Sequence, residues 1–210
     1  MASNPEPDPP AQAAVVPDRR EEFRQMTVRL VAKLRTSERE ELCLVRNLSS
    51  RGLTAHVYSA IEVDSAVTFE FASGVTIPAR VVWQRDSVMG VQFAERTDPA
   101  LILSVRERFP DAPAPRAPRV ELNIGATARV NMVHRPITLN NISQGGARVA
   151  VEEPVDVREK LTLLIDGLPP LTGQVRWSRG GVAGLAFLSP VPFDILAQWL
   201  PMVQRPPESG

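Results

Sequence analysis

The chain has 210 residues, a formal net charge of zero at pH 7, one cysteine and two histidines. This length allows one or two domains, and the zero net charge disfavours binding to a nucleic acid polymer or to a membrane surface. Too few cysteines and histidines are present for a disulfide or a zinc site, and no apolar run approaches the roughly 20 residues that span a bilayer. Since no signal peptide is recognised either, we expect a cytoplasmic protein without membrane insertion and without a metal.

The N-terminal segment, residues 1–17, is rich in proline and alanine and is expected to be a disordered tail. From Thr27 to Ala94, short runs with alternating apolar residues predict five or six strands separated by turns. Strands of this length and spacing are typical of a small antiparallel barrel or sandwich. As strand residues, Trp83 and Trp177 are expected in a barrel core, and the alternative is that they form platforms for a ligand.

A change of period after the last of these strands predicts a short helix. Asp98 and Pro99 form a start signal, and Ala100–Arg108 has apolar residues at helical spacing. The segment that follows is rich in proline and alanine and indicates a semi-rigid linker. A second helix is predicted at Pro192–Leu200.

The chain also repeats itself at a fixed offset. The segment Asn47-Leu-Ser-Ser-Arg-Gly52 returns as Asn141-Ile-Ser-Gln-Gly-Gly146, which is 94 residues later, and the same offset separates Trp83 from Trp177. A constant offset over nearly fifty positions predicts two copies of one domain. The expected parts of the chain are a tail at 1–17, a first domain at 18–109, a linker at 110–118, a second domain at 119–201 and a tail at 202–210.

Two motifs in the first copy carry candidate binding chemistry. An Arg-x-x-x-Arg motif, preceded by a further arginine, stands before the first strand, and an Asn-x-Ser-x-x-Gly motif follows the predicted hairpin. Taken alone, the first motif also fits a solvated charged arm, and the second also fits an ordinary polar turn. The residues of the two motifs are Arg19, Arg20, Arg24, Asn47, Ser49 and Gly52.

The two motifs together resemble the PilZ domain family. The strands ending as Arg80-Val-Val-Trp83 and Met89-Gly-Val-Gln-Phe93 add to this resemblance, which covers Asp18 to Leu200. It implies a mainly β fold with two tandem six-stranded antiparallel barrels, each followed by a short C-terminal α-helix. PilZ domains with both motifs typically bind the bacterial second messenger cyclic di-GMP. The resemblance therefore implies a cyclic di-GMP receptor with no catalytic residue and no cofactor.

The resemblance also implies a role for each motif residue. Arg20 and Arg24 would bind phosphate oxygens or guanine, because a guanidinium group can form forked hydrogen bonds and stack on a base. Asn47 and Ser49 would provide polar contacts to guanine or ribose. Gly52 would allow positive φ in the turn and close approach of the backbone to the ligand.

Ligand binding is expected to order the arm that precedes the first strand. In the family, the position of Arg19 influences whether one ligand or a stacked pair of ligands binds. Fixing several residues costs about 1–2 kcal/mol each, so moderate affinity, on the order of micromolar, is expected.

The second copy departs from the first in its arginines. An alignment that pairs Ala32 with Ala128 assumes that the second copy is two residues shorter before its Asn motif. Arg20 then meets Arg116, but Arg24 meets no arginine, so the spacing becomes Arg-x-x-Arg. Each lost charge-assisted contact costs about 1.5–3 kcal/mol, which predicts weak binding or none. This weak second site would comprise Arg116, Arg119, Asn141, Ser143 and Gly146.

The main alternative function is an adaptor of the same fold that binds protein and no nucleotide. In either case we expect a protein partner, with motility, pilus and polysaccharide machinery as open alternatives. The sequence contains no paired histidine and carboxylate, no Ser-His-Asp order and no phosphate-binding glycine loop, which argues against an enzyme. No recognition-helix pattern indicates DNA binding.

Overall fold

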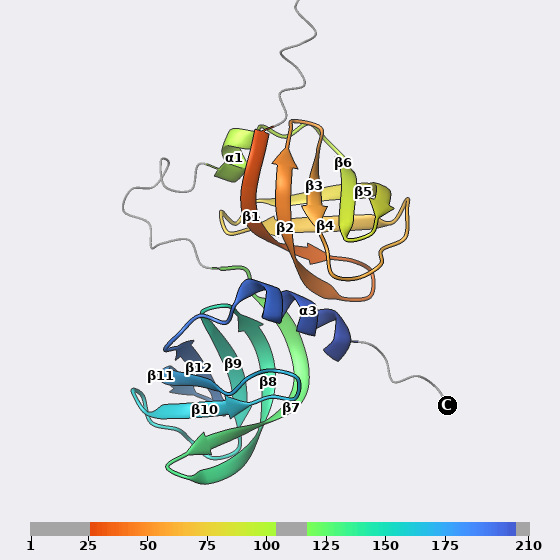
Figure 1. Cartoon of the computed structure of the whole chain (residues 1–210). Coiled ribbons are helices and arrows are strands. Elements are labelled where there is room, and N and C mark those ends of the chain that lie inside the picture. Colours follow the sequence, from red (N-terminus) through yellow and green to blue (C-terminus); the bar gives the residue numbers. More distant parts are fainter. Residues whose placement is uncertain (1–25, 104–116, 205–210) are drawn as a thin grey trace, which may run out of the picture.

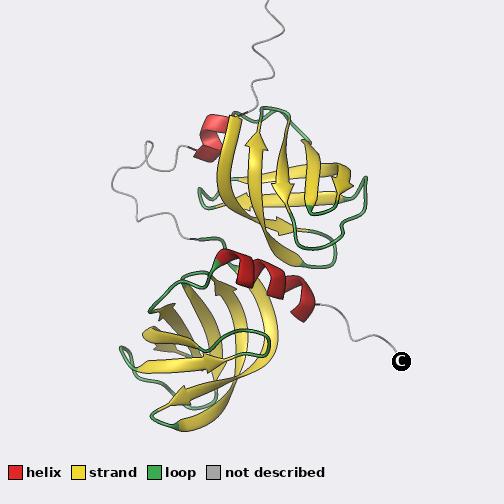
Figure 2. Ribbon diagram, in the orientation of Figure 1, coloured by secondary structure: helices red, strands yellow, loops and turns green. Residues whose placement is uncertain are grey.

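The computed structural model describes residues 26–103 and 117–204, and these form two closed six-stranded antiparallel barrels, one after the other along the chain (Figures 1 and 2). The predicted fold class is confirmed. The first barrel comprises β1 (Met26–Arg35), β2 (Glu40–Leu48), β3 (Gly52–His56), β4 (Ala66–Phe71), β5 (Thr76–Arg85) and β6 (Val88–Phe93). The second comprises β7 (Val120–Val130), β8 (Val133–Ser143), β9 (Gly146–Val151), β10 (Lys160–Leu164), β11 (Leu171–Arg179) and β12 (Val182–Phe187).

The two barrels have the same topology. The strand order around the first is β1-β2-β3-β6-β5-β4, and the second has the equivalent order β7-β8-β9-β12-β11-β10. Closure leaves no free edge strand, and away from the β-bulges alternate side chains point into a core of aliphatic and aromatic groups. Each barrel has its own apolar cluster, so the internal repeat corresponds to two structural domains.

A short helix follows each barrel. Helix α1 (Pro99–Leu103) begins as predicted, because the Asp98 carboxylate accepts a hydrogen bond of 2.9 Å from the Ala100 N–H. The rest of the expected first helix lies outside the described residues. Helix α3 (Phe193–Val203) continues past Pro201, although the sequence predicts its end at Leu200.

The register of the strands corrects the alignment of the two copies. In both barrels the first two strands pair from end to end at the same offset of 94 residues. The counterpart of Ala32 is therefore Ala126 (126 − 32 = 94) and not Ala128, and no residues are missing from the second copy. Equivalent pairs near the two ends of each hairpin are Thr27–Asn47 and Arg35–Glu40 in the first barrel, and Glu121–Asn141 and Arg129–His134 in the second.

Helix α3 lies between the barrels and contacts both (Figure 1). Leu42 from β2 is buried in the same apolar cluster as Leu196 and Leu200 of α3, and Val31 and Tyr58 pack against that cluster. The first barrel therefore contributes apolar side chains to the core of the second.

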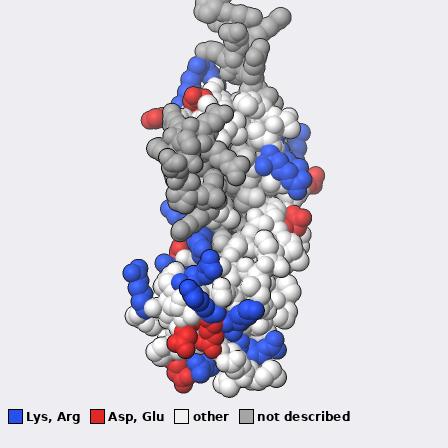
Figure 3. Space-filling view, turned by 90° about the vertical axis from the view of Figure 1, so that its left-hand side faces the viewer, with Lys and Arg blue, Asp and Glu red and all other residues white. Residues whose placement is uncertain are grey.

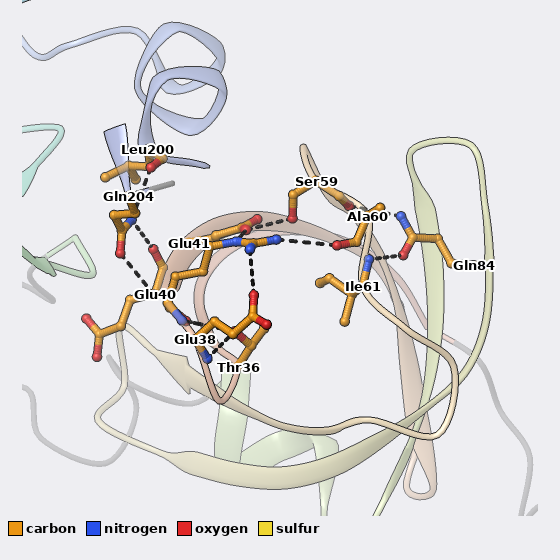
Figure 4. Close-up of polar contacts among 11 residues, drawn as sticks. Thr36, Glu38, Glu40, Glu41, Ser59, Ala60, Ile61, Gln84, Leu200 and Gln204 are labelled. Atoms are coloured by element: carbon orange, nitrogen blue, oxygen red, sulfur yellow. Dashed lines mark hydrogen bonds and ion pairs between the residues drawn. The ribbon is translucent and has the colours of Figure 1, made fainter. Parts of the chain in front are cut away.

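Polar bonds surround this apolar contact. The Gln204 side chain donates to the Glu40 carbonyl at 2.7 Å and accepts from the Glu40 N–H at 3.3 Å (Figure 4). The Glu40 carboxylate accepts a bond of 3.0 Å from the Glu121 N–H. Burial raises the pKa of Glu40, but this bond and the neighbouring Arg35 and Lys33 outweigh burial and lower it overall.

Tyr58 completes the contact between the barrels. Its hydroxyl donates a hydrogen bond of 2.8 Å to the Asp194 carboxylate at the start of α3, and its ring meets Phe193 edge-on. Burial and this hydrogen bond raise the pKa of Tyr58 to about 12.

Candidate functional site

The Asn-x-Ser-x-x-Gly motif forms the tight turn between β2 and β3. The Ser49 N–H and hydroxyl both donate to the Gly52 carbonyl, at 2.9 Å and 3.0 Å, and the Arg51 N–H donates to the Ser49 hydroxyl at 3.3 Å. In the second barrel the Ser143 hydroxyl donates to the Gly146 carbonyl in the same way, at 3.2 Å. The serine of each motif therefore shapes its own turn.

The glycine of each motif is required by a close approach between strands. A Cβ atom on Gly52 would lie 2.1 Å from the Val91 carbonyl oxygen, and one on Gly146 would lie 2.2 Å from the Leu185 carbonyl oxygen. Neither glycine has positive φ, so the expectation of a left-handed turn residue at Gly52 is wrong. The missing side chain lets β3 pack directly against β6.

Asn47 lies on the outer face of the first barrel and remains half-exposed. Its side-chain amide donates to the Thr54 hydroxyl at 2.9 Å, and its carbonyl oxygen accepts a long bond of 3.4 Å from the Thr27 hydroxyl. Thr27 and Thr54 are its register partners on β1 and β3. The surroundings of Asn47 are therefore neutral, and its oxygen is only weakly engaged.

Trp83 lies on the same outer face, so its expected place in the core is wrong. A β-bulge between Val81 and Trp83 sets both Val82 and Trp83 opposite Gly90, so both side chains point outward. Trp83 is 37% exposed as a residue, and its indole ring covers Gly90, where a Cβ atom would lie 2.3 Å from the ring. The same bulge and the same glycine contact recur at Trp177, so the two tryptophans occupy equivalent places.

These residues line an open hollow of about 340 Å³ on the first barrel. Its walls combine hydrogen-bonding groups with the exposed face of an indole ring, which suits a planar ligand that also carries polar edges. The lining residues that carry this chemistry are Asn47, Ser49, Arg51, Gly52, Thr54, Trp83 and Gln92.

The predicted arginines of the first site, Arg19, Arg20 and Arg24, lie outside the described residues. The described chain starts at Met26, and β1 then runs beside the end of β2, with Thr27 opposite Asn47. An extended chain covers about 3.3 Å per residue, so Arg24, two residues before Met26, can reach roughly 7 Å along the chain from this edge, and Arg20, six residues before it, roughly 20 Å.

The equivalent place on the second barrel contains charged residues. Glu121 stands where the first barrel has Thr27, and Arg148 stands where it has Thr54. Asn141 is only 4% exposed, and its amide donates to Glu121 at 3.0 Å while its oxygen accepts from Arg119 at 3.1 Å. The Arg148 guanidinium is 2.8 Å from the Glu121 carboxylate. Arg119 is the residue directly before β7.

In this arrangement the polar groups of the second site pair with one another, beside an open hollow of about 490 Å³ lined by Glu121, Arg148 and Trp177. Both ends of the Asn141 amide are engaged by protein groups, and the Glu121 carboxylate already pairs with Arg148, so a phosphate would have to compete with Glu121 for that guanidinium. Acidic and basic side chains lie side by side on the visible face of the second barrel (Figure 3). Arg116 lies outside the described residues. At the corrected offset of 94, Arg116 aligns with Glu22 and Arg119 aligns with Gln25, so neither aligns with an arginine of the first copy.

Arg51 and Thr54 were not among the predicted site residues, and Trp83 was considered for the site only as the alternative to a place in the core. The recurrence of Trp83 and Gly90 at the repeat offset was visible in the sequence, but simple alternation does not reveal that a bulge turns the tryptophan outward. Among the described residues no cluster of histidine, cysteine, aspartate and glutamate could hold a metal ion. None of the described helices has the length and apolar character needed to cross a membrane.

Comparison with known proteins places these observations in a family. Three solved structures resemble the chain: the PlzA protein of Borreliella burgdorferi in complex with cyclic di-GMP, the inhibitor of motility (MotI/DgrA) of Bacillus subtilis, and YcgR of Escherichia coli in complex with cyclic di-GMP. The sequence identities are 9%, 14% and 10%, and the TM-scores are 0.38, 0.36 and 0.31. The matches cover 84%, 84% and 83% of this chain and 93%, 95% and 81% of the other.

No curated protein matches the chain in a sequence search. The family described as PilZ domain matches twice, over residues 18–107 and over residues 114–200. These two stretches coincide with the two barrels and account for most of the chain. The protein belongs to the PilZ domain family and contains two PilZ domains in tandem.

Proposed function

We propose that this protein is a receptor for cyclic di-GMP that binds the dinucleotide on the outer face of the first barrel. PilZ domain proteins are non-enzymatic receptors for this ligand, so the protein acts by binding and not by catalysis. The observation that carries the proposal is the hollow formed by Asn47, Gly52 and Trp83, at the edge where β1 begins. The arginine motif directly precedes that edge in the sequence.

The chemistry of the hollow matches the parts of the ligand. Asn47 provides an amide whose oxygen is weakly engaged and free to exchange its long bond for one to a guanine edge or a ribose. The exposed face of Trp83 provides a stacking surface, and base–aromatic stacking contributes about 1–3 kcal/mol per base. Arg20 and Arg24 would add charge-assisted bonds to the two phosphates.

The second barrel supports the same assignment by contrast. There Arg119 donates a hydrogen bond to the Asn141 side chain, so an arginine directly before the first strand of a barrel can contact the motif asparagine. Because Glu121 already pairs with Arg148 and Asn141, we infer that the second domain binds no dinucleotide and contributes to contacts with a protein partner.

Titration calorimetry of the full chain with cyclic di-GMP tests this proposal. We expect the wild type to bind with an affinity on the order of micromolar. The variants Arg20→Ala, Arg24→Ala and Asn47→Ala are each expected to bind at least about tenfold more weakly, which corresponds to about 1.4 kcal/mol of binding free energy. The matched changes Arg116→Ala and Asn141→Ala in the second copy are expected to leave affinity within about twofold.

The outcomes separate the competing functions. If the wild type does not bind, the adaptor function replaces the receptor. If the changes in the second copy weaken binding as much as those in the first, the assignment of the site to the first barrel fails.

The ligand would act by ordering the arm that carries the arginines. Fixing backbone costs about 1–2 kcal/mol per residue, and charge-assisted bonds to the phosphates offset that cost. Amide hydrogen exchange is expected to slow across Arg19–Gln25 when cyclic di-GMP is added, while the nucleotide itself is recovered unchanged. An arm that is equally protected with and without ligand would contradict this mechanism.

A further inference from the structure

Each barrel has an end where its first two strands join in a hairpin, and we call this end its mouth. The two mouths are equivalent because the repeat offset is constant across both hairpins. In the first barrel the mouth is filled by its own side chains. Leu34 is fully buried below it, Arg39 lies across it, and the inward-facing Glu41 is only 1% exposed.

The first mouth is closed by the Arg39 side chain, which has an aliphatic stem and a charged guanidinium end. The Arg39 guanidinium pairs with the Glu41 carboxylate and also donates to the Ala60 carbonyl at 3.3 Å. The Ser59 hydroxyl donates to the same carboxylate at 2.6 Å, so Glu41, Ser59 and Ala60 gather around the arginine (Figure 4).

The second mouth lacks these fillings. Ala128 replaces Leu34 and removes most of an inward-facing side chain, and Val133 replaces Arg39 and is 54% exposed instead of closing the barrel. The result is an open cavity of about 360 Å³. Its inner walls are aliphatic and are formed by Ala128, Val130, Ile137, Val151 and Val155.

The charges at the second mouth differ from those at the first. Arg135 occupies the inward-facing position of Glu41, and the exposed Glu153 stands at the repeat position of Ser59, with Glu152 beside it in the lining of the cavity. The Arg135 guanidinium is 3.2 Å from the Glu153 carboxylate, with the two side chains 35% and 70% exposed. An exposed pair of this kind is held weakly, so a ligand anion can take the place of Glu153 beside Arg135.

We propose that the mouth of the second barrel binds a small aliphatic carboxylate, with its chain in the cavity and its carboxylate on Arg135. The first barrel provides the template, because there an aliphatic stem with a cationic end closes the mouth onto an inward-facing carboxylate. In the second barrel the inward-facing residue is Arg135 and carries a positive charge. An aliphatic chain that closes this mouth in the same way therefore ends in an anionic group. A cavity of about 360 Å³ lies near the lower limit of ligand pockets, which selects a single unbranched chain of medium length.

Decanoate, used below its micelle concentration, is the probe for this site. Calorimetry with the full chain is expected to give one site, and methyl resonances of Val130 and Val155 are expected to shift. Ala128→Leu restores the filling of the first barrel and is expected to weaken binding about tenfold or more. Arg135→Gln removes the anchoring cation and is expected to weaken it by roughly a factor of ten.

Controls keep the result specific. Arg129→Gln removes a neighbouring exposed cation that does not line the cavity, and its affinity is expected to stay within about twofold of wild type. Decylamine has the same chain with the opposite charge and is expected to bind worse than decanoate. Unchanged decanoate binding by a folded Ala128→Leu variant, or decylamine binding as tightly as decanoate, would overturn the proposal.

Discussion

At the scale of single residues, the motif glycine sets how closely two strands of each barrel pack. Gly52 meets the Val91 carbonyl and Gly146 meets the Leu185 carbonyl at almost the same separation. The glycine is thus a structural requirement of the barrel. Gly52 also lines the hollow, where it adds no side chain. A motif residue that the sequence assigned to the ligand is therefore required by the fold.

A substitution at this position tests the steric argument. Gly52→Ala would place a Cβ atom 2.1 Å from the Val91 carbonyl oxygen, so the strands must separate, and we expect a loss of about 1–3 kcal/mol in the free energy of unfolding. Urea denaturation followed by circular dichroism measures this change. Gly145→Ala is the matched control, because a Cβ atom there meets nothing within 4 Å and the first copy already has Arg51 at that place. A loss as large for Gly145→Ala as for Gly52→Ala would contradict the argument.

At the scale of elements, the bulge in β5 determines that an aromatic side chain lines the hollow. Without the bulge, Trp83 would share the inward face with Val81, and the hollow would lose its aromatic surface. The bulge in β11 does the same for Trp177, so it is a property of the repeat. Helix α3 is the second decisive element, because it docks the second domain onto β2 of the first.

The docking of α3 can be followed through the only tyrosine of the chain. Tyr58 is bonded to Asp194, and its pKa is raised to about 12 from an ordinary 10.0, so this contact stabilises the docked state fully below pH 10 and is lost as the pH rises towards 12. We expect the near-ultraviolet absorbance of tyrosinate to appear well above pH 10. Asp194→Asn removes the carboxylate and is expected to bring the transition closer to pH 10, whereas the exposed Asp156→Asn is expected to leave it in place.

At the scale of the whole molecule, the two domains share an apolar contact. Leu42 belongs to the first barrel but is buried in the apolar cluster of the second, next to α3. β2 therefore touches the second domain at its start and carries Asn47 near its end. The stability of the first domain and the docking of the second are coupled through this strand.

Leu42→Ala tests this coupling in the full chain. Removing a fully buried leucine is expected to cost about 2–5 kcal/mol in the free energy of unfolding, because the cavity lies between two domains that pack on each other. Thermal denaturation followed by calorimetry is expected to show both domains affected. Val63→Ala, at a position that is half-exposed, is expected to change stability by less than about 0.5 kcal/mol. A transition confined to one domain would argue against a shared contact.

The sequence by itself determined the number of domains, the fold class and the two motifs. A repeat with a constant offset and strands with alternating apolar residues are local signals that predict two small antiparallel barrels or sandwiches, and the resemblance of the motifs to the PilZ family implied six-stranded barrels. The start of α1 at Pro99 was equally local, because a carboxylate directly before a proline caps the first turn. Asn47, Ser49 and Gly52 are close in sequence and so are necessarily close in space.

Only the tertiary structure decided the remaining features, because each depends on a partner distant in the chain. Trp83 faces outward through a bulge opposite Gly90, and the reason for Gly52 is the Val91 carbonyl on another strand. The register of β7 with β8 removed an apparent two-residue gap that matching alanines had suggested. Whether the motif asparagine is weakly engaged or pairs with a residue such as Glu121 depends on which residues the neighbouring strands bring beside it, and the pairing of those strands is a property of the closed barrel.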